Sequence, residues 1–206
     1  MNEQVPLSFP GRREPAGNAT IILAGDIGGT KTNLGLFRAE NGEVTLIKET
    51  GYPSRDYDNL ASLIRQFLSE NGNASPGRIC LGVAGPVIQG KVQTTNLPWE
   101  FSGEDIGKQT GVSFVSLIND LEATAYGLAA LSSGDFDLIH AGSTDNPGNA
   151  AIIAPGTGLG EGGLYWDGKS YRPFATEGGH CDFAPRSVPD IEFYQYLRKK
   201  YDFVSW

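Results

Sequence analysis

The sequence has little of several residue types, and each shortage excludes a class of protein. Its 206 residues include only 2 Cys, and Cys80 and Cys181 lack metal-ligand spacing, so we expect free, buried thiols in a reducing cytoplasm. No apolar run approaches the ~18 residues of a membrane-spanning helix, so we expect no membrane segment. Lys and Arg number 16 against 24 Asp and Glu, without a basic cluster, which argues against a nucleic-acid partner.

The N-terminal residues 1–18 have few apolar side chains and contain Pro6, Pro10 and Pro15. This composition predicts a disordered leader. Arg12-Arg13 matches the start of a twin-arginine signal, but the apolar segment that such a signal requires does not follow. We therefore expect an untargeted tail.

Glycine, in contrast, is abundant, and one glycine-rich stretch joins two strand-like runs at residues 20–24 and 33–37. The stretch runs from Ala24 to Thr32 and predicts a hairpin. A P-loop is a poorer interpretation, because threonine replaces the second glycine of that pattern and no helix follows. A glycine-rich turn that binds nothing is the remaining alternative.

The hairpin turn carries groups suited to phosphate. We expect Gly28 and Gly29 to adopt positive φ and to let the backbone approach a ligand. Thr30, Lys31 and the backbone amides then supply hydrogen-bond donors for phosphate oxygens.

Hydrophobic periodicity predicts a mixed α/β chain in the order βββαβαβα. Expected strands lie at residues 20–24, 33–37, 44–50, 79–84 and 112–118, and expected helices at 60–68, from 102 onward, and at 121–131. A segment rich in glycine and aspartate, residues 132–149, then interrupts the pattern. We therefore expect a small α/β domain over 19–131 and a second unit over 132–206.

The second unit opens with a strand at 150–154 and a glycine turn at 155–160. The spacing Gly158-x-Gly160-x-x-Gly163 matches the dinucleotide fingerprint, but a strand and not a helix follows it, so the Rossmann interpretation fails. The pattern predicts a second phosphate-facing hairpin instead. Two unrelated structural turns remain the alternative.

Four motifs together resemble bacterial glucokinase. They are the segments Leu23 to Thr30, Leu117 to Ala123, Ala154 to Gly160 and Glu177 to Pro185. The resemblance covers residues 20–206 and implies an actin-like ATPase (ribonuclease H-like) fold, with a complete small domain and an incomplete large domain. It also implies a cytoplasmic, homodimeric enzyme that uses ATP and Mg²⁺ to phosphorylate glucose on its 6-hydroxyl.

The resemblance assigns roles to individual residues. ATP phosphates would contact Gly25, Asp26, Ile27, Gly28, Gly29 and Thr30 in the first turn, and Gly156, Thr157 and Gly158 in the second. The sugar would contact Asn96, Asn119, Asp120, Glu177 and His180. Asp120 is the expected general base, because phosphoryl transfer needs a group that accepts the proton of the attacking hydroxyl. No side chain is assigned as a metal ligand.

Two of these assignments have structural alternatives. Asn119-Asp120 stands where a strand meets a helix, so the pair also suits an N-cap. His180 is one of only 2 His, and a single histidine in a loop also suits a structural role.

In the family, the segment that matches residues 201–206 continues into a further sugar-binding glutamate and the rest of the large domain. We therefore expect a truncated chain whose last helix, beginning near Ile191, exposes an apolar face. Three functions stay open: a glucokinase, a sugar- or nucleotide-binding domain without turnover, and an actin-like assembly protein. Glu177-Gly178-Gly179-His180 disfavours the third, because an assembly protein needs no sugar-recognition pair.

Overall fold

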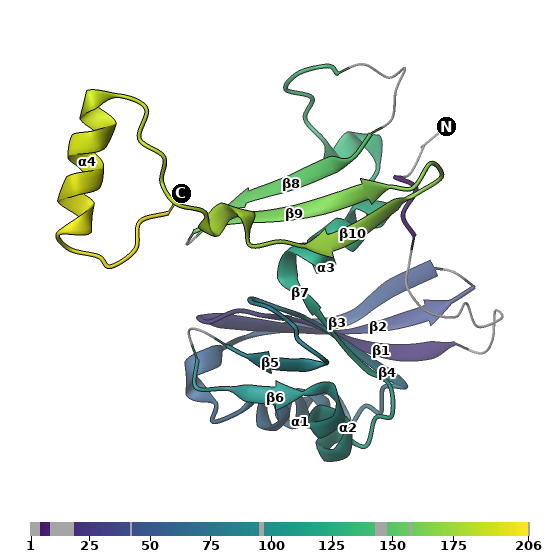
Figure 1. The fold of residues 1–206 in the computed structure, drawn as a ribbon. Coiled ribbons are helices and arrows are strands. Elements are labelled where there is room, and N and C mark those ends of the chain that lie inside the picture. Colours follow the sequence, from purple (N-terminus) through teal and green to yellow (C-terminus); the bar gives the residue numbers. More distant parts are fainter. Residues whose placement is uncertain are drawn as a thin grey trace. The chain divides into compact units, whose positions relative to one another are not determined.

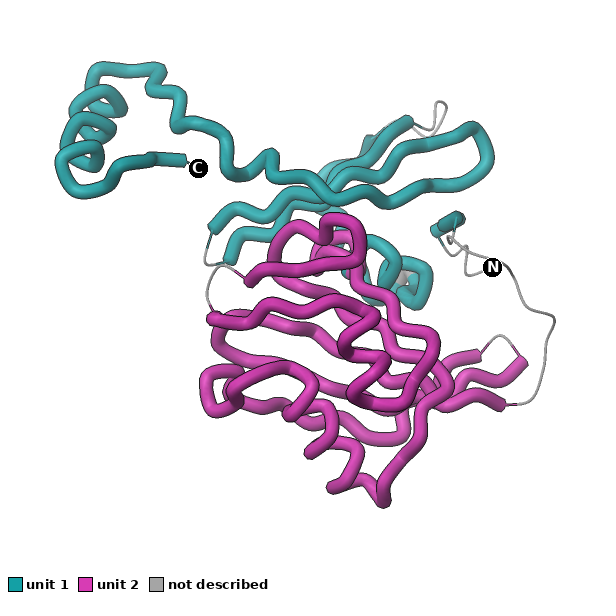
Figure 2. Tube along the Cα trace, turned by 60° about the horizontal axis from the view of Figure 1, so that its bottom comes forward, with its two compact units in different colours: residues 1–9, 124–206 teal, residues 10–123 magenta. Residues whose placement is uncertain are grey.

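The computed structural model describes residues 5–8, 19–41, 43–94, 97–142, 148–156 and 158–205. The chain forms two compact units: unit 1 comprises residues 1–9 and 124–206, and unit 2 comprises residues 10–123 (Figure 2). The boundary falls inside helix α3 (Asp120–Gly127), and not after it as the sequence suggested. The first turn of α3 belongs to unit 2 because Ala123 packs on Gly82 of the sheet there.

Unit 2 is built on a five-stranded mixed sheet with the order β3-β2-β1-β4-β7 (Figure 1). Its strands are β1 (Thr20–Ile27), β2 (Lys31–Glu40), β3 (Glu43–Pro53), β4 (Arg78–Val83) and β7 (Val115–Asn119). The first three strands form antiparallel pairs, whereas β1, β4 and β7 run parallel. The carboxyl ends of these three parallel strands therefore meet at one edge of the sheet.

Two helices cover one face of this sheet: α1 (Leu60–Glu70) and α2 (Gly103–Thr110) (Figure 1). Asn59 caps the start of helix α1, because its side chain accepts a hydrogen bond from the amide of Ser62. Its inner face is fully buried at Leu63 and Phe67, and each such side chain stabilises the fold by about 1.5–3 kcal/mol. The short strands β5 (Lys91–Gln93) and β6 (Glu100–Ser102) form a separate hairpin before α2.

Unit 1 contains an antiparallel sheet of β8 (Ala150–Pro155), β9 (Leu159–Trp166) and β10 (Tyr171–Ala175), with β9 in the middle.

Four 3₁₀ turns occur in the described chain: η1 (Ser54–Asp56), η2 (Leu128–Ala130), η3 (Ser133–Asp135) and η4 (Gly178–His180). The last helix is α4 (Val188–Arg198). The expected mixed α/β architecture is thus present in the described residues.

Part of the expected leader is ordered. Within residues 5–8, the amide of Ser8 donates to the carbonyl oxygen of Tyr171 at 2.8 Å, and the amide of Tyr171 donates to Pro6 at 2.8 Å. The expectation of disorder is therefore wrong for this short segment. Strand β10 is an edge strand with free backbone groups, and an extended proline-containing segment can pair with them.

Helix α4 has no buried residue, and Ile191, Phe193 and Tyr196 are about half exposed. The expected apolar surface on this helix is thus confirmed. Both cysteines are free, as expected, but Cys181 is exposed and only Cys80 is partly buried. Across the described residues, no helix has the length and apolarity needed to cross a membrane.

Candidate functional site

Polar side chains gather at the carboxyl ends of the parallel strands of unit 2. Asp26 lies near the end of β1, Asn119 is the last residue of β7, and Asp120 begins α3. Gly82 of β4 pairs with Asp26 on one side and with Ile118 on the other. Because Gly82 has no side chain, α3 starts close to the sheet: a Cβ there would lie 3.8 Å from Asp120 Cα. The two carboxylates therefore occupy the same edge.

Asn119 caps helix α3. Its Oδ1 accepts hydrogen bonds from the amides of Leu121 at 3.0 Å and Glu122 at 3.2 Å, and its Nδ2 donates to the carbonyl oxygen of Gly85 at 3.2 Å. The residue is buried. Its side chain also forms a hydrogen bond with the carboxyl group of Asp120.

Asp120 has an environment that suits a proton acceptor. Burial is the main cause that raises the pKa of its carboxyl group above the ordinary aspartate value, and the negative charge of Asp26 raises it further. A hydrogen bond from the amide of Leu121, at 2.9 Å, opposes this shift. A higher pKa makes the carboxylate a stronger base than a free aspartate.

The first glycine turn is closed by the amide of Gly28, which donates to the carbonyl oxygen of Lys31 at 3.1 Å. The positive φ predicted for Gly28 is wrong. Glycine is needed there for space, since a Cβ would lie 2.9 Å from the carbonyl oxygen of Lys31. The side chain of Lys31 lies over Gly51 of β3. Asp26 is exposed and carries a weak hydrogen bond from Asn33 at 3.4 Å.

The second glycine turn lies in unit 1, between β8 and β9. The amide of Gly156 donates to the carbonyl oxygen of Gly158 at 2.8 Å, which closes the turn. Thr157 lies outside the described residues, as does Asn96, the extra sugar contact that the resemblance implies.

Glu177 directly precedes the short turn η4, and His180 is the last residue of that turn. The amide of His180 donates to the carbonyl oxygen of Glu177 at 3.0 Å, and both side chains are exposed. The ring of His180 packs against Phe203, with ring centroids 4.8 Å apart. A carboxylate and an imidazole held three residues apart on one turn can both bind hydroxyl groups of a single ligand.

Turn η4 packs directly on the backbone that follows the second glycine turn. Gly179 is buried, and a Cβ at this position would overlap the carbonyl oxygen of Leu159. Only glycine permits this approach, so Gly179 links the second glycine turn to the pair Glu177 and His180. Within unit 1, the structure thus brings together two motifs that are separate in sequence.

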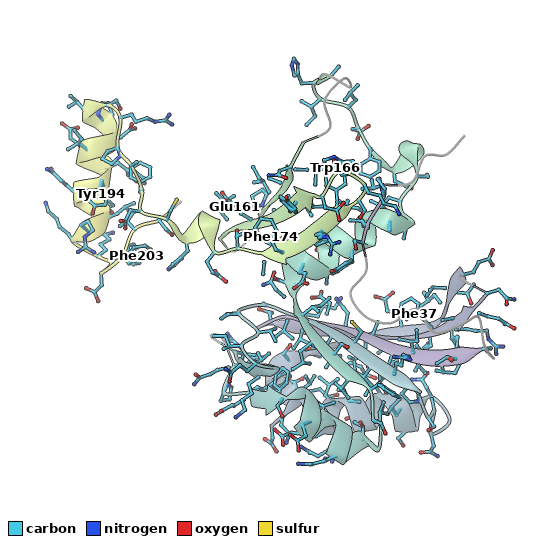
Figure 3. The ribbon with its side chains drawn as sticks, turned by 45° about the vertical axis from the view of Figure 1, so that its right-hand side comes forward. Phe37, Glu161, Trp166, Phe174, Tyr194 and Phe203 are labelled. Carbon is cyan, nitrogen blue, oxygen red and sulfur yellow. The ribbon has the colours of Figure 1, made fainter. Side chains whose placement is uncertain are left out.

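Sequence reasoning missed Glu161, which lies in the middle strand of unit 1 and is labelled in Figure 3. Its carboxylate lies over Gly178, where a Cβ would overlap Oε2. The backbone oxygen of Glu161 also accepts a hydrogen bond from the hydroxyl of Thr176 at 2.7 Å. The sequence offered no signal, because Glu161 stands at an unspecified position of the glycine pattern.

Comparison with known proteins identifies the family. The family model described as Glucokinase matches residues 23–206. The chain belongs to the glucokinase family. It is 41% identical over 185 residues to a glucokinase of Trichormus variabilis and 40% identical over 192 residues to one of Synechocystis. These alignments cover 89% and 87% of this chain and 54% of each relative.

Solved structures of glucokinases have the same fold. The chain is similar to the glucokinase of an Antarctic psychrotroph, with a TM-score of 0.71, 34% identity, and coverage of 90% of this chain and 59% of that one. It also superposes on a glucokinase from Balamuthia mandrillaris in complex with glucose, with a TM-score of 0.68 and 24% identity over 89% of this chain and 56% of that one. The chain spans about half the length of the curated glucokinases that it matches, 54%.

Proposed function

We propose that this chain carries out the glucokinase reaction, in which the γ-phosphoryl group of ATP is transferred to the 6-hydroxyl of glucose. The observation that carries this proposal is the half-buried carboxyl of Asp120 at the end of β7, with its raised pKa and with Asp26 nearby. A base at such a site can accept the hydroxyl proton as the phosphoryl group moves. Membership of the family supports the choice of substrates.

The other residues divide between nucleotide and sugar. In this proposal residues 25–30 and 156–158 contact the ATP phosphates through backbone amides, and Asn119, Glu177 and His180 bind glucose hydroxyls. Polar pairing of this kind discriminates strongly against sugars that lack the matching hydroxyl. Thr157 and Asn96 keep these roles as predictions.

Magnesium suits the first turn. Mg²⁺ binds through one or two carboxylates together with substrate phosphates, and the exposed carboxylate of Asp26 stands next to the phosphate turn. Asp26 would therefore hold the ion, which neutralises charge on the phosphate oxygens when bound. The remaining chemistry belongs to the protein side chains.

We further propose the actin-like ATPase fold for the whole protein, with unit 2 as the small domain and unit 1 as part of the large domain. The mixed sheet of unit 2 and the likeness to solved glucokinases support this. A cytoplasmic location and a homodimeric state are the expectations that accompany the family resemblance.

Binding measurements separate this proposal from the two alternatives. Isothermal titration calorimetry with glucose and with MgATP, followed by assay of ATP consumption with and without glucose, gives three distinct patterns. A kinase binds both ligands and consumes ATP only with glucose. A binding domain binds without consumption, and an assembly-type ATPase binds ATP and ignores glucose. The proposal predicts the first pattern.

The raised pKa of Asp120 predicts a specific pH dependence. The base must be ionised to act, so kcat/KM falls as the pH drops through the pKa of Asp120. The substitution Asp26→Asn removes a negative charge that raises this pKa. The acid limb of the residual kcat/KM profile should therefore move to lower pH in the variant. Steady-state rates across the acid range measure this shift.

The matched control for this experiment is Glu104→Gln. Glu104 is exposed on α2 and forms an ion pair with Lys108 at 2.6 Å. Its substitution by Gln removes one negative charge from unit 2, as Asp26→Asn does. Its acid limb should coincide with that of the wild type. An unmoved limb in Asp26→Asn would contradict the assigned coupling between the two carboxylates.

A further inference from the structure

A pair of buried hydroxyl groups lies against the first glycine turn. Thr32 Oγ1 and Ser54 Oγ are 3.0 Å apart, and both residues are fully buried. Ser54 Oγ also lies 2.7 Å from the carbonyl oxygen of Gly28. A hydroxyl donates one proton, and a carbonyl oxygen only accepts. The hydrogen bonds therefore run in one direction, from Thr32 to Ser54 and from Ser54 to Gly28.

The backbone of Ser54 holds a second point of the same turn. Its amide donates to the carbonyl oxygen of Thr30 at 3.0 Å. One residue thus fixes the carbonyl groups on both sides of Gly29. In a trans peptide the N–H points opposite to the C=O, and the described chain has no cis peptide bond. The amides that share these two peptide units, those of Gly29 and Lys31, therefore point away from Ser54.

We propose that Ser54 is a positioning residue for the nucleotide, and that Thr32 keeps the Ser54 proton directed at Gly28. Ser54 orients the backbone amides of Gly29 and Lys31 as donors for ATP phosphate oxygens. This inference rests on the proposed function, because phosphate is the ligand proposed for this turn. Donors that are fixed before binding need not be ordered by the ligand, so affinity rises.

Strand β3 carries this residue to the turn. Lys31 of β2 pairs with Pro53, the last residue of β3. Ser54 is the next residue after Pro53, so this register places it beside the first glycine turn. The bulge between Leu36 and Phe37 is the one register shift described in this pair, and it lies far from the turn. The hydroxyl of Ser54 is hydrogen-bonded to Thr32 on one side and to Gly28 on the other. The buried serine therefore contributes hydrogen bonds at this point and not apolar packing.

The substitution Ser54→Ala tests the inference through two readouts. Amide hydrogen exchange at residues 28–31 should become about tenfold faster, because the Gly28 carbonyl loses its buried donor. The dissociation constant for MgATP should rise by about tenfold, and that for glucose should stay unchanged. Thr32→Val leaves the bond from Ser54 to Gly28 in place, so its effect on both readouts should be smaller.

The matched control is Tyr52→Phe. Tyr52 lies two residues before Ser54, is also buried, and loses a hydroxyl that donates to Glu70 at 2.6 Å, away from the turn. It should lower the free energy of unfolding without changing exchange at residues 28–31 or the affinity for MgATP. A purely structural role for Ser54 would make the two variants behave alike.

The possible results separate the inference from the proposed function. Unchanged exchange at residues 28–31 in Ser54→Ala would overturn the inference, whatever the nucleotide does. Faster exchange together with weaker MgATP binding would support both. A wild-type chain that binds no MgATP, while Ser54→Ala still loosens the turn, would overturn the proposed function and leave the role of Ser54 in shaping the turn.

Discussion

Asp120→Asn should lower kcat by about 10³-fold while the protein folds normally. The amide cannot accept the proton of the attacking hydroxyl, but it keeps the shape of the carboxyl group. The substitution leaves the start of the helix intact, because Asn119 accepts from the amides of Leu121 and Glu122, and the side-chain oxygen of asparagine can still accept from Leu121 as Asp120 does. The KM for glucose should change little. Steady-state kinetics with glucose and MgATP measure both constants.

Asp120→Asn should also change how the free energy of unfolding depends on pH. The folded state raises the pKa of Asp120, so the folded protein binds its proton more tightly than the unfolded chain, and stability falls as pH rises through this pKa. Asparagine does not ionise, so the variant does not lose stability in this way as the pH rises. Asp120→Asn should therefore be at least as stable as the wild type at pH 7 and lose its advantage at low pH. Urea unfolding at both pH values measures this difference.

Glu122→Gln is the control for Asp120→Asn. Glu122 lies on the same helix, and burial likewise raises the pKa of its carboxyl group. It touches no proposed ligand, so kcat should stay close to the wild-type value. Equal losses of kcat in the two variants would show that the negative charge on α3 matters, and would contradict the role of Asp120 as the base.

Gly179→Ala should raise the KM for glucose by about 100-fold and destabilise the fold by about 3 kcal/mol. The added methyl group would overlap the carbonyl oxygen of Leu159, which is backbone and cannot rotate away as a side chain could. The turn η4 must then move, and Glu177 and His180 move with it. Glucose titration and thermal unfolding measure the two effects.

Gly127→Ala provides a control of opposite sign in the same unit. Gly127 has helical dihedral angles, φ −60° and ψ −26°, and a Cβ there meets no atom within 4 Å. Alanine should stabilise the protein by up to about 1 kcal/mol and leave the KM for glucose unchanged. If Gly179→Ala behaved like Gly127→Ala, the close packing on Leu159 would have no functional importance.

Local patterns in the sequence predicted much of this fold. Strand β1 and helix α1 follow from their apolar spacing, and Ser102 caps α2 by accepting a hydrogen bond from the amide of Asp105, within three residues of itself. These features depend on contacts between near neighbours or on alternation alone, which one sequence displays directly.

The features that the sequence did not predict depend on contacts between distant segments. Ser54 reaches Gly28 across 26 positions of the chain, and Thr32 reaches Ser54 across 22. Glu161 and Gly178 lie on different elements, and so do Leu159 and Gly179. No periodicity marks a residue whose partner is chosen by the tertiary fold. The sequence allows capping by either residue of the Asn119-Asp120 pair, and only the structure shows that Asn119 accepts from the amides of Leu121 and Glu122 while Asp120 accepts from Leu121 alone.

The most direct test of the account follows the γ-phosphoryl group itself. The 206-residue chain is mixed with ATP labelled in that group, Mg²⁺ and glucose, and the products are separated; 6-deoxyglucose, which lacks the acceptor hydroxyl, serves as the parallel sample. The account predicts label in glucose 6-phosphate, no labelled sugar from 6-deoxyglucose, and a loss of about 10³-fold in Asp120→Asn. Label that goes only to water, or that stays in ATP although both ligands bind, would contradict it.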